Sequence, residues 1–139
     1  MLILIVDDDP ATVSFMRLAF SAAGHSVSTA SSVGEAISRA SDEPLDVVLS
    51  DLAFGSALDG ERDGCSLARA LRSMPATAGV GLLAVSGAGS PDVLRDTADS
   101  GFDGFVSKPV DLASLLDRVD RLGELVAARR SAAPHPGHT

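Results

Sequence analysis

The sequence predicts an α/β fold in which a five-stranded parallel sheet has helices on both faces. Two observations support this class: short apolar runs bounded by turn residues recur along the chain, and segments of helical periodicity lie between them. Strand and helix alternate five times, and every crossover is long enough to contain a helix, which favours parallel pairing. With 139 residues, the chain is large enough for one domain with a substantial hydrophobic core.

The strand candidates are short and mostly aliphatic. They are residues 2–6, 26–30, 46–50, 81–86 and 104–107. Four of them are apolar runs, as is typical of strands that are buried on both faces of a parallel sheet. The second, SVSTA, alternates polar and apolar residues instead, so we expect one of its faces to be less covered.

Capping residues mark where the first two helices begin and end. Asp9 precedes Pro10 at the start of the first helix, and Gly24 follows its last turn. Ser32 and Glu35 have the spacing of a capping box at the start of the second helix.

The later helices are marked by similar signals. Ser90 and Pro91 open the fourth helix, and Gly101 ends it. The fifth has one apolar stripe, at positions 112, 115, 116, 119 and 122. The final residues, SAAPHPGHT, show no periodicity and are rich in proline, glycine and small side chains. We therefore expect one folded domain at residues 1–125 and a flexible tail at residues 126–139.

The composition excludes several classes of protein. A formal net charge of -8 argues against a non-specific nucleic-acid surface, because phosphate backbones are bound by clustered lysine and arginine. No apolar run approaches the length of a membrane span, and the single cysteine, Cys65, cannot form an internal disulfide. We therefore expect a cytoplasmic protein whose partner is neither a nucleic acid nor a membrane.

Polar residues follow the carboxyl ends of four strands. They are Asp7, Asp8 and Asp9 after the first, Asp51 after the third, Ser86 and Gly87 at the fourth, and Lys108 and Pro109 after the fifth. In an open parallel sheet, ligands bind outside these ends, where the strand order reverses. In the flavodoxin-like order 2-1-3-4-5, the first and third strands are neighbours at that point. We therefore expect their carboxylates to meet.

Carboxylates brought together repel one another unless a positive charge lies among them. Oxygen ligands suit Mg²⁺, which keeps several of its waters and is commonly shared with a phosphate group. Lys108 is the only lysine in the chain, and its compact ammonium can reach a phosphoryl oxygen. Ser86 adds a hydroxyl donor, and Gly87 leaves the backbone beside it open. The pattern predicts a site for Mg²⁺ and a phosphoryl group.

These strand ends resemble those of the receiver domain of two-component response regulators. The resemblance is carried by LIVDDDP, VVLSD, AVSG and GFVSKP, and it extends over about residues 1 to 125. It implies the flavodoxin-like (βα)5 receiver fold. It also implies that Asp51 is the phosphoacceptor and a metal ligand, that Asp8 binds Mg²⁺ directly, and that Asp7 is a ligand through water or a helper. The main-chain carbonyl of Ala53 would complete the metal site.

The resemblance further implies phosphoryl contacts and a switch. Ser86, Gly87 and Lys108 would contact the phosphoryl group, and the peptide bond between Lys108 and Pro109 would be cis. Ser86 would be drawn toward the phosphoryl oxygen, and Phe105 would rotate into the space that Ser86 leaves.

The loop after Asp51 departs from the family's pattern. It reads DLAFGSALDGERDG, without the usual Met-Pro pair, and it contains two Asp-Gly pairs. We place the start of the next helix at the second pair, Asp63 and Gly64, which makes the loop of residues 52–63 longer than usual. Ala53 is apolar where many relatives are polar, and this bears on the lifetime of the phosphorylated state.

The resemblance implies a stand-alone, single-domain response regulator. A sensor histidine kinase or a phosphotransfer protein would donate the phosphoryl group, and the chain would catalyse only that transfer and its own dephosphorylation. The signal would reach a downstream protein through the fourth helix, fifth strand and fifth helix, near Arg95, Phe105 and Leu112. We expect a monomer or a weak homodimer.

Three other interpretations stay open. The chain could be the receiver portion of a larger regulator, or a receiver-like scaffold that works without phosphorylation, which the altered loop favours. The third is an enzyme of the same fold. A phosphatase would place a second acid two residues beyond Asp51, where this chain has Ala53. A flavin protein would need a loop rich in Ser, Thr and Gly after the first strand, where this chain has acids.

Overall fold

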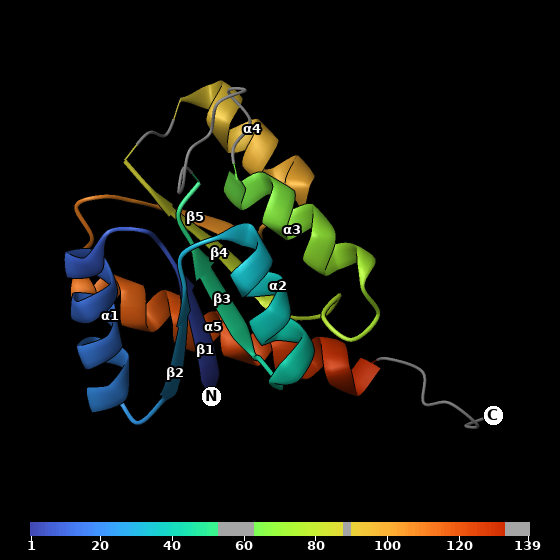
Figure 1. Cartoon of the computed structure of the whole chain (residues 1–139), viewed down its shortest axis with the longest axis horizontal. Coiled ribbons are helices and arrows are strands. Elements are labelled where there is room, and N and C mark those ends of the chain that lie inside the picture. The colour runs from blue at the N-terminus through green and yellow to red at the C-terminus, as the bar shows by residue number, and fades with distance from the viewer. Residues whose placement is uncertain (53–62, 88–89, 133–139) are drawn as a thin grey trace.

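The structure is a computed structural model that describes residues 1–52, 63–87 and 90–132. Strands and helices alternate along these residues, as the sequence predicts (Figure 1). The elements are β1 (Leu2–Val6), α1 (Pro10–Ala22), β2 (Ser26–Ala30), α2 (Val33–Asp42), β3 (Val47–Ser50), α3 (Asp63–Ser73), β4 (Gly81–Ser86), α4 (Pro91–Ser100), β5 (Gly104–Ser107) and α5 (Leu112–Ala132). No helix within the described ranges is both long and apolar enough to cross a bilayer.

The five strands form one parallel sheet in the order β2-β1-β3-β4-β5, which confirms the predicted fold class. β1 pairs with β2 on one side and with β3 on the other, so that Ile3 lies opposite both Val27 and Val47. β2 is an edge strand, and only Ala30 in it is buried. Because β1 and β3 are neighbours, the residues that follow them emerge side by side at the carboxyl edge of the sheet.

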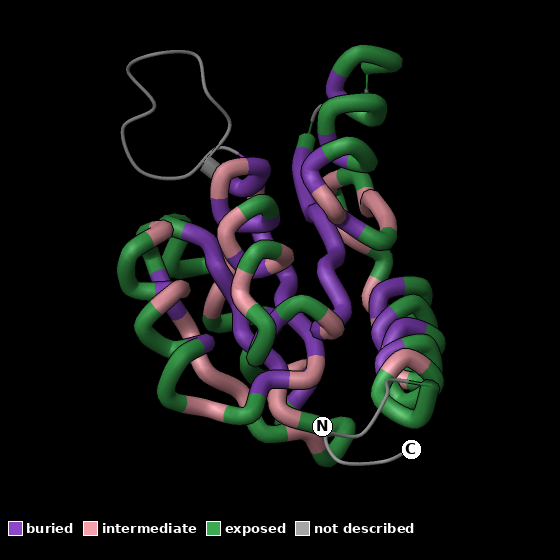
Figure 2. Tube along the Cα trace, turned by 90° about the vertical axis from the view of Figure 1, so that its right-hand side faces the viewer, coloured by how far each residue is buried: buried purple, intermediate pink, exposed green. Residues whose placement is uncertain are grey.

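Each face of the sheet has its own hydrophobic core. Successive residues of a strand point to opposite faces, so Leu4 and Ile5 of β1 belong to different cores. Helices α2, α3 and α4 pack on the face of Leu4, and α1 and α5 pack on the face of Ile5 (Figure 1). Burial is almost continuous along β1, β3 and β4, whereas the outer sides of the helices are exposed (Figure 2). This rigid centre holds the strand ends in fixed positions.

Helix α5 continues beyond the expected end of the folded domain. It runs to Ala132, and Val126 within it is only 2% exposed. The expected flexible tail at residues 126–139 is therefore wrong for residues 126–132, while residues 133–139 lie outside the described residues. Val126 extends the apolar stripe of the helix, but the small and charged residues around it obscure the periodicity in the sequence.

Two arginines fix this extension of α5 to the amino end of the sheet. The Arg130 guanidinium donates to Asp46 Oδ1 over 2.6 Å and to the Leu45 carbonyl oxygen over 2.8 Å. Arg129 forms an ion pair with Asp103, which directly precedes β5. The last turns of α5 are therefore held at the end of the sheet opposite the aspartates that follow β1 and β3.

Candidate functional site

Three aspartates meet at the carboxyl edge of the sheet, as the strand order predicts. Asp7 and Asp8 follow β1, and Asp51 follows β3. One carboxylate oxygen from each of the three lies within 4.8 Å of the others. Asp9, by contrast, is the N-cap of α1 and does not belong to this group. The structure thus brings together the three carboxylates that the resemblance implies as metal ligands or helpers.

The three carboxylates differ in their exposure to solvent. Asp7 is only 5% exposed, Asp51 is half-buried and Asp8 is exposed. The Asp9 amide donates to Asp7 Oδ1 over 2.9 Å, and the Asp7 amide donates to the Ala30 carbonyl oxygen over 3.1 Å. Asp7 therefore lies fixed at the base of the site, while Asp8 lies at its open side.

The ammonium of Lys108, the residue directly after β5, completes the cluster. Its Nζ lies 3.2 Å from Asp7 Oδ2 and 3.4 Å from Asp51 Oδ2. Burial by itself lowers the pKa of Lys108, but the carboxylates of Asp51 and Asp7 outweigh it, and the pKa is raised above its ordinary value. The side chain therefore stays positively charged at neutral pH and offsets part of the repulsion between the aspartates.

The backbone around Lys108 is also specified. The peptide bond between Lys108 and Pro109 is cis, as expected. The Lys108 amide donates to the Ser86 carbonyl oxygen over 2.9 Å, which extends the pairing of β4 with β5 by one residue beyond Ser107. The end of β4 and the lysine are therefore held next to each other.

The Asp51 carboxylate has a defined orientation. The Asp51 amide donates to the Val6 carbonyl oxygen over 2.9 Å, which continues the pairing of β1 with β3. The Leu52 amide donates to Asp51 Oδ1 over 2.7 Å, while Asp51 Oδ2 faces Lys108. Each oxygen of this carboxylate thus has a different environment.

The expected switch residues lie on the neighbouring strands. Ser86 ends β4 and is 9% exposed, next to the exposed Gly87. A Cβ atom added to Gly87 would meet no atom within 4 Å among the described residues, so this position is open to an incoming group. Phe105 on β5 is half-buried and packs against the core under α2, α3 and α4. The positions of Ser86, Gly87 and Phe105 are compatible with their predicted roles. No contact among the described residues tests those roles.

Part of the prediction lies outside the described residues. Ala53, whose carbonyl oxygen is expected to bind the metal, lies outside them. So does most of the unusual loop at residues 52–63. Helix α3 begins at Asp63, which agrees with the choice of the second Asp-Gly pair as the end of that loop.

A hollow beside the site was not predicted from the sequence. It is lined by Lys108, Pro109 and residues of α1, among them Thr12 and Phe15. Phe15 is 48% exposed, and Leu18, one turn further along α1, is 72% exposed. The signal in the sequence is that α1 has apolar residues outside the stripe of Met16 and Phe20 that enters the core.

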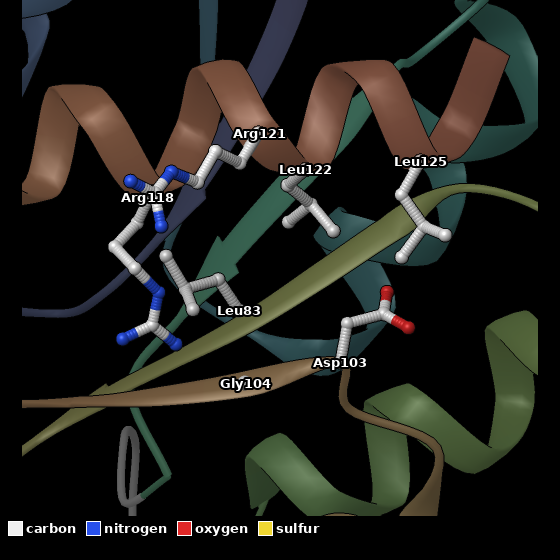
Figure 3. Close-up of a pocket in the computed structure, with 7 residues that line it drawn as sticks. All are labelled: Leu83, Asp103, Gly104, Arg118, Arg121, Leu122 and Leu125. Atoms are coloured by element: carbon white, nitrogen blue, oxygen red, sulfur yellow. The ribbon is translucent and has the colours of Figure 1, made fainter. Parts of the chain in front are cut away.

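A second hollow lies against α5, away from Asp7, Asp8 and Asp51. Leu83, Leu122 and Leu125 form its apolar wall, and Arg118 and Asp103 lie at its rim (Figure 3). It contains no member of the cluster formed by Asp7, Asp8, Asp51 and Lys108. The hollow is therefore separate from the candidate metal site.

The donor set of the cluster fits a hard divalent cation. Its ligand atoms are carboxylate oxygens, and no cysteine or histidine belongs to the group found among the described residues. Mg²⁺ prefers such oxygens and retains waters in its remaining positions, which the exposure of Asp8 permits.

Comparisons with known proteins agree with this geometry. A family model described as response regulator receiver domain matches residues 3–120. The gliding motility regulatory protein of Myxococcus xanthus is 32% identical over 121 residues, which are 86% of this chain and 15% of that protein. This chain thus spans a small part of the length of that relative.

Solved structures show the same fold. A response regulator receiver domain protein from Methanospirillum hungatei JF-1 superposes with a TM-score of 0.82 at 23% identity, over 92% of this chain and 97% of that one. The receiver domain of a sensor histidine kinase from Pseudomonas aeruginosa PAO1 gives a TM-score of 0.79 at 20% identity, over 88% of this chain and 97% of that one. The latter structure has a magnesium ion coordinated in its active site cleft.

Proposed function

The chain belongs to the response regulator receiver domain family, and from this premise we propose that it is a phosphoacceptor switch of a two-component system or phosphorelay. Receiver domains interact with histidine kinases or phosphotransfer proteins. A protein of one of these two classes is the proposed phosphoryl donor, and the proposed location of the switch is the cytoplasm. The observation that carries the proposal is the Lys108 ammonium, which lies against both Asp7 and Asp51 at the edge where β1 and β3 are neighbours.

Asp51 is the proposed nucleophile. One of its carboxylate oxygens attacks the phosphorus of a phosphohistidine on the donor and forms an O–P bond. The P–N bond breaks, its electron pair stays on the imidazole nitrogen, and that nitrogen takes up a proton. The transfer leaves an aspartyl phosphate on Asp51. Since little covalent chemistry falls to the other residues, positioning and charge stabilisation are expected to control the rate.

Lys108 is proposed to stabilise the charge of the transferring group. Its ammonium holds two carboxylates in the resting protein and can exchange one of them for a phosphoryl oxygen. A lysine suits this exchange because it is a point charge on a flexible stem. Ser86 and Gly87, at the neighbouring strand end, are the proposed donors to a second phosphoryl oxygen.

Mg²⁺ is the proposed cofactor. Asp8 and Asp51 would hold it, with Asp7 as a ligand through water or as a helper and Ala53 contributing its carbonyl oxygen. When bound, the ion neutralises negative charge on the carboxylates and on the phosphoryl oxygens. The acidic donor set and the magnesium ion in the related Pseudomonas aeruginosa domain support this assignment.

The hollow beside Lys108 is the proposed contact surface for the donor protein. Exposed Phe15 on α1 lines the hollow, and exposed Leu18 lies one turn further along the helix. A partner that covers them would bring its phosphohistidine close to Asp51. The burial of these side chains would supply binding energy without contributing to the chemistry.

The output of the switch is proposed to pass through α4, β5 and α5. Ser86 moves toward the phosphoryl group, Phe105 follows it, and the surface near Arg95, Phe105 and Leu112 changes its preferred partner. A hollow on this side is lined by Phe105, Val106, Ser114 and Arg118, among other residues. A monomer or a weak homodimer fits this mode of signalling.

Phosphorylation of the isolated protein tests the proposal. Incubation with acetyl phosphate and Mg²⁺ should increase the intact mass by one phosphoryl group. Asp51→Asn should abolish the increase, while Asp92→Asn, at an exposed position on α4, should not. Two results would favour the alternative of a receiver-like scaffold that works without phosphorylation. The wild-type protein would gain no mass with acetyl phosphate, or its spectra would not change when beryllofluoride is added.

The length of the native protein needs a separate measurement. The relative from Myxococcus xanthus is much longer than this chain, which covers 15% of it. The intact mass of the product isolated from its own cells would distinguish a stand-alone regulator from the receiver portion of a larger one.

A further inference from the structure

The peptide group between Asp51 and Leu52 lies between Ser50 and the first turn of α3. Ser50 is 1% exposed, and its hydroxyl donates to the Asp51 carbonyl oxygen over 2.7 Å. The Gly64 amide donates over 3.1 Å to the Leu52 carbonyl oxygen, which belongs to the peptide group that follows. The first turn of α3 therefore lies directly on the backbone of the proposed phosphoacceptor.

Gly64 allows this close approach because it lacks a side chain. A Cβ atom at this position would lie 2.4 Å from the Asp51 carbonyl oxygen, 2.9 Å from Leu52 Cα and 3.2 Å from the Asp51 carbonyl carbon. All three are backbone atoms, so they cannot be moved aside by a change of rotamer. Any larger residue at this position must displace either the start of α3 or the peptide itself.

The orientation of this peptide determines the orientation of the nucleophile. The same peptide group supplies the Leu52 amide, which donates to Asp51 Oδ1. When the peptide is fixed, Oδ1 is fixed, and Asp51 Oδ2 is left facing the Lys108 ammonium. A rotation of the peptide would turn the carboxylate away from this geometry.

We propose that Ser50 and Gly64 are positioning residues for phosphoryl transfer, because they hold the peptide whose amide orients the Asp51 carboxylate. Neither residue touches the phosphoryl group. This inference rests on the proposed function, since it assigns a role in the transfer to Asp51. Through Gly64, α3 acts on the acceptor.

Kinetics with acetyl phosphate as the probe test the proposal. The rate of phosphorylation in Mg²⁺ is measured against acetyl phosphate concentration for wild type, Gly64→Ala, Ser50→Ala and Ser50→Thr. We expect Gly64→Ala and Ser50→Ala to lower the maximal rate about tenfold or more and to leave the half-saturating concentration unchanged, because only alignment is lost. Ser50→Thr, which keeps the hydroxyl, should restore most of the rate.

Gly34→Ala is a matched control. Gly34 is the second residue of α2, as Gly64 is of α3, and a Cβ atom there would meet nothing within 4 Å. Its rate should equal that of wild type. Thermal unfolding of each variant identifies those that fold, and if Gly64→Ala does not fold, the Ser50 pair carries the test. Wild-type rates in folded Ser50→Ala or Gly64→Ala would overturn the proposal.

A second readout separates this inference from the proposed function. Hydrogen exchange of the Leu52 amide reports on its bond to Asp51 without any phosphodonor. We expect faster exchange in Ser50→Ala than in wild type or Ser50→Thr, and equal exchange in all three would overturn the inference. If wild type accepts no phosphoryl group, the proposed function fails, and this exchange measurement still decides whether the peptide is held.

Discussion

At the scale of the residue, the site contains three aspartates in three different environments. Asp7 is buried, Asp51 is half-buried and Asp8 is exposed, although all three follow neighbouring strands. The sequence predicts that these carboxylates meet, because strand order brings their positions together. It does not predict their depth, which depends on how the loop backbones turn after each strand. The depth of each carboxylate decides whether it lies fixed at the bottom of the site or is accessible as a ligand.

Substitutions at Lys108 test the role of its charge. We expect Lys108→Gln to lower the maximal rate of phosphorylation by about 100-fold, because a preorganised donor to the developing charge is lost. Lys108→Arg should lie between this variant and wild type, since it keeps the charge but presents a planar fork. The rates are measured by intact mass after mixing with acetyl phosphate. A Lys108→Gln variant that matches wild type would contradict the role assigned to the ammonium.

At the scale of the element, Asp103 joins three parts of the fold. Its Oδ2 accepts hydrogen bonds from Arg72 of α3 over 3.0 Å and from the Leu82 amide of β4 over 2.9 Å. Arg129 of α5 binds both of its oxygens. Burial raises the pKa of Asp103, but the hydrogen bonds from Arg129 and Leu82 and the charge of Arg72 outweigh it, so the pKa lies below its ordinary value.

The hydrogen bonds and ion pairs of Asp103 predict a specific dependence of stability on pH. Because the pKa is lower in the folded state, the contribution of Asp103 is complete above the pKa of the unfolded chain, about 4, and is lost as pH falls through the folded value. Asp103→Asn should therefore be less stable than wild type at pH 7, and the difference should shrink on acidification. Urea unfolding from pH 7 down to pH 3 measures it.

The control for this experiment is Asp92→Asn. Asp92 is 85% exposed and lies 3.8 Å from Arg95, so its removal should change the free energy of unfolding little at any pH. A difference between wild type and Asp103→Asn that stays constant with pH would contradict the assignment.

The elements themselves were largely predictable. Apolar runs predicted β1, β4 and β5 with their observed bounds, and the alternating segment SVSTA predicted those of β2. The end of α5 was missed, since Val126 is a single buried residue among small and charged ones. The contacts of Ser50 and Gly64 were missed for a different reason. Both are contacts to backbone atoms, and no periodicity of side chains reports them.

At the scale of the whole molecule, the distribution of charge is uneven. The chain has a formal net charge of -8, and the cluster at the carboxyl edge adds to the repulsion. With three carboxylates and one ammonium ionised, the site carries a net charge of two negative units, which one divalent cation would neutralise. Cation binding is therefore expected to stabilise the folded state as well as to prepare the chemistry.

Thermal unfolding with and without Mg²⁺ tests this linkage. At a concentration about ten times the dissociation constant, Mg²⁺ should stabilise wild type by about 1.4 kcal/mol and raise its Tm, and a chelator should reverse the change. Asp8→Asn should remove this response and should be at least as stable as wild type without metal, because one of three like charges is gone. Asp42→Asn, at the exposed end of α2, should keep it. An undiminished response in Asp8→Asn would exclude Asp8 as a ligand.

The solitary ammonium of Lys108 has a practical consequence. Since no other side-chain amine exists in the sequence, reagents that acylate amines can modify only this side chain and the chain terminus. Pairing with two carboxylates keeps the nitrogen protonated and so protects it from acylation. The speed of labelling at this one atom is therefore a built-in probe of whether its acidic neighbours still hold it, and it needs neither a fluorophore nor a partner protein.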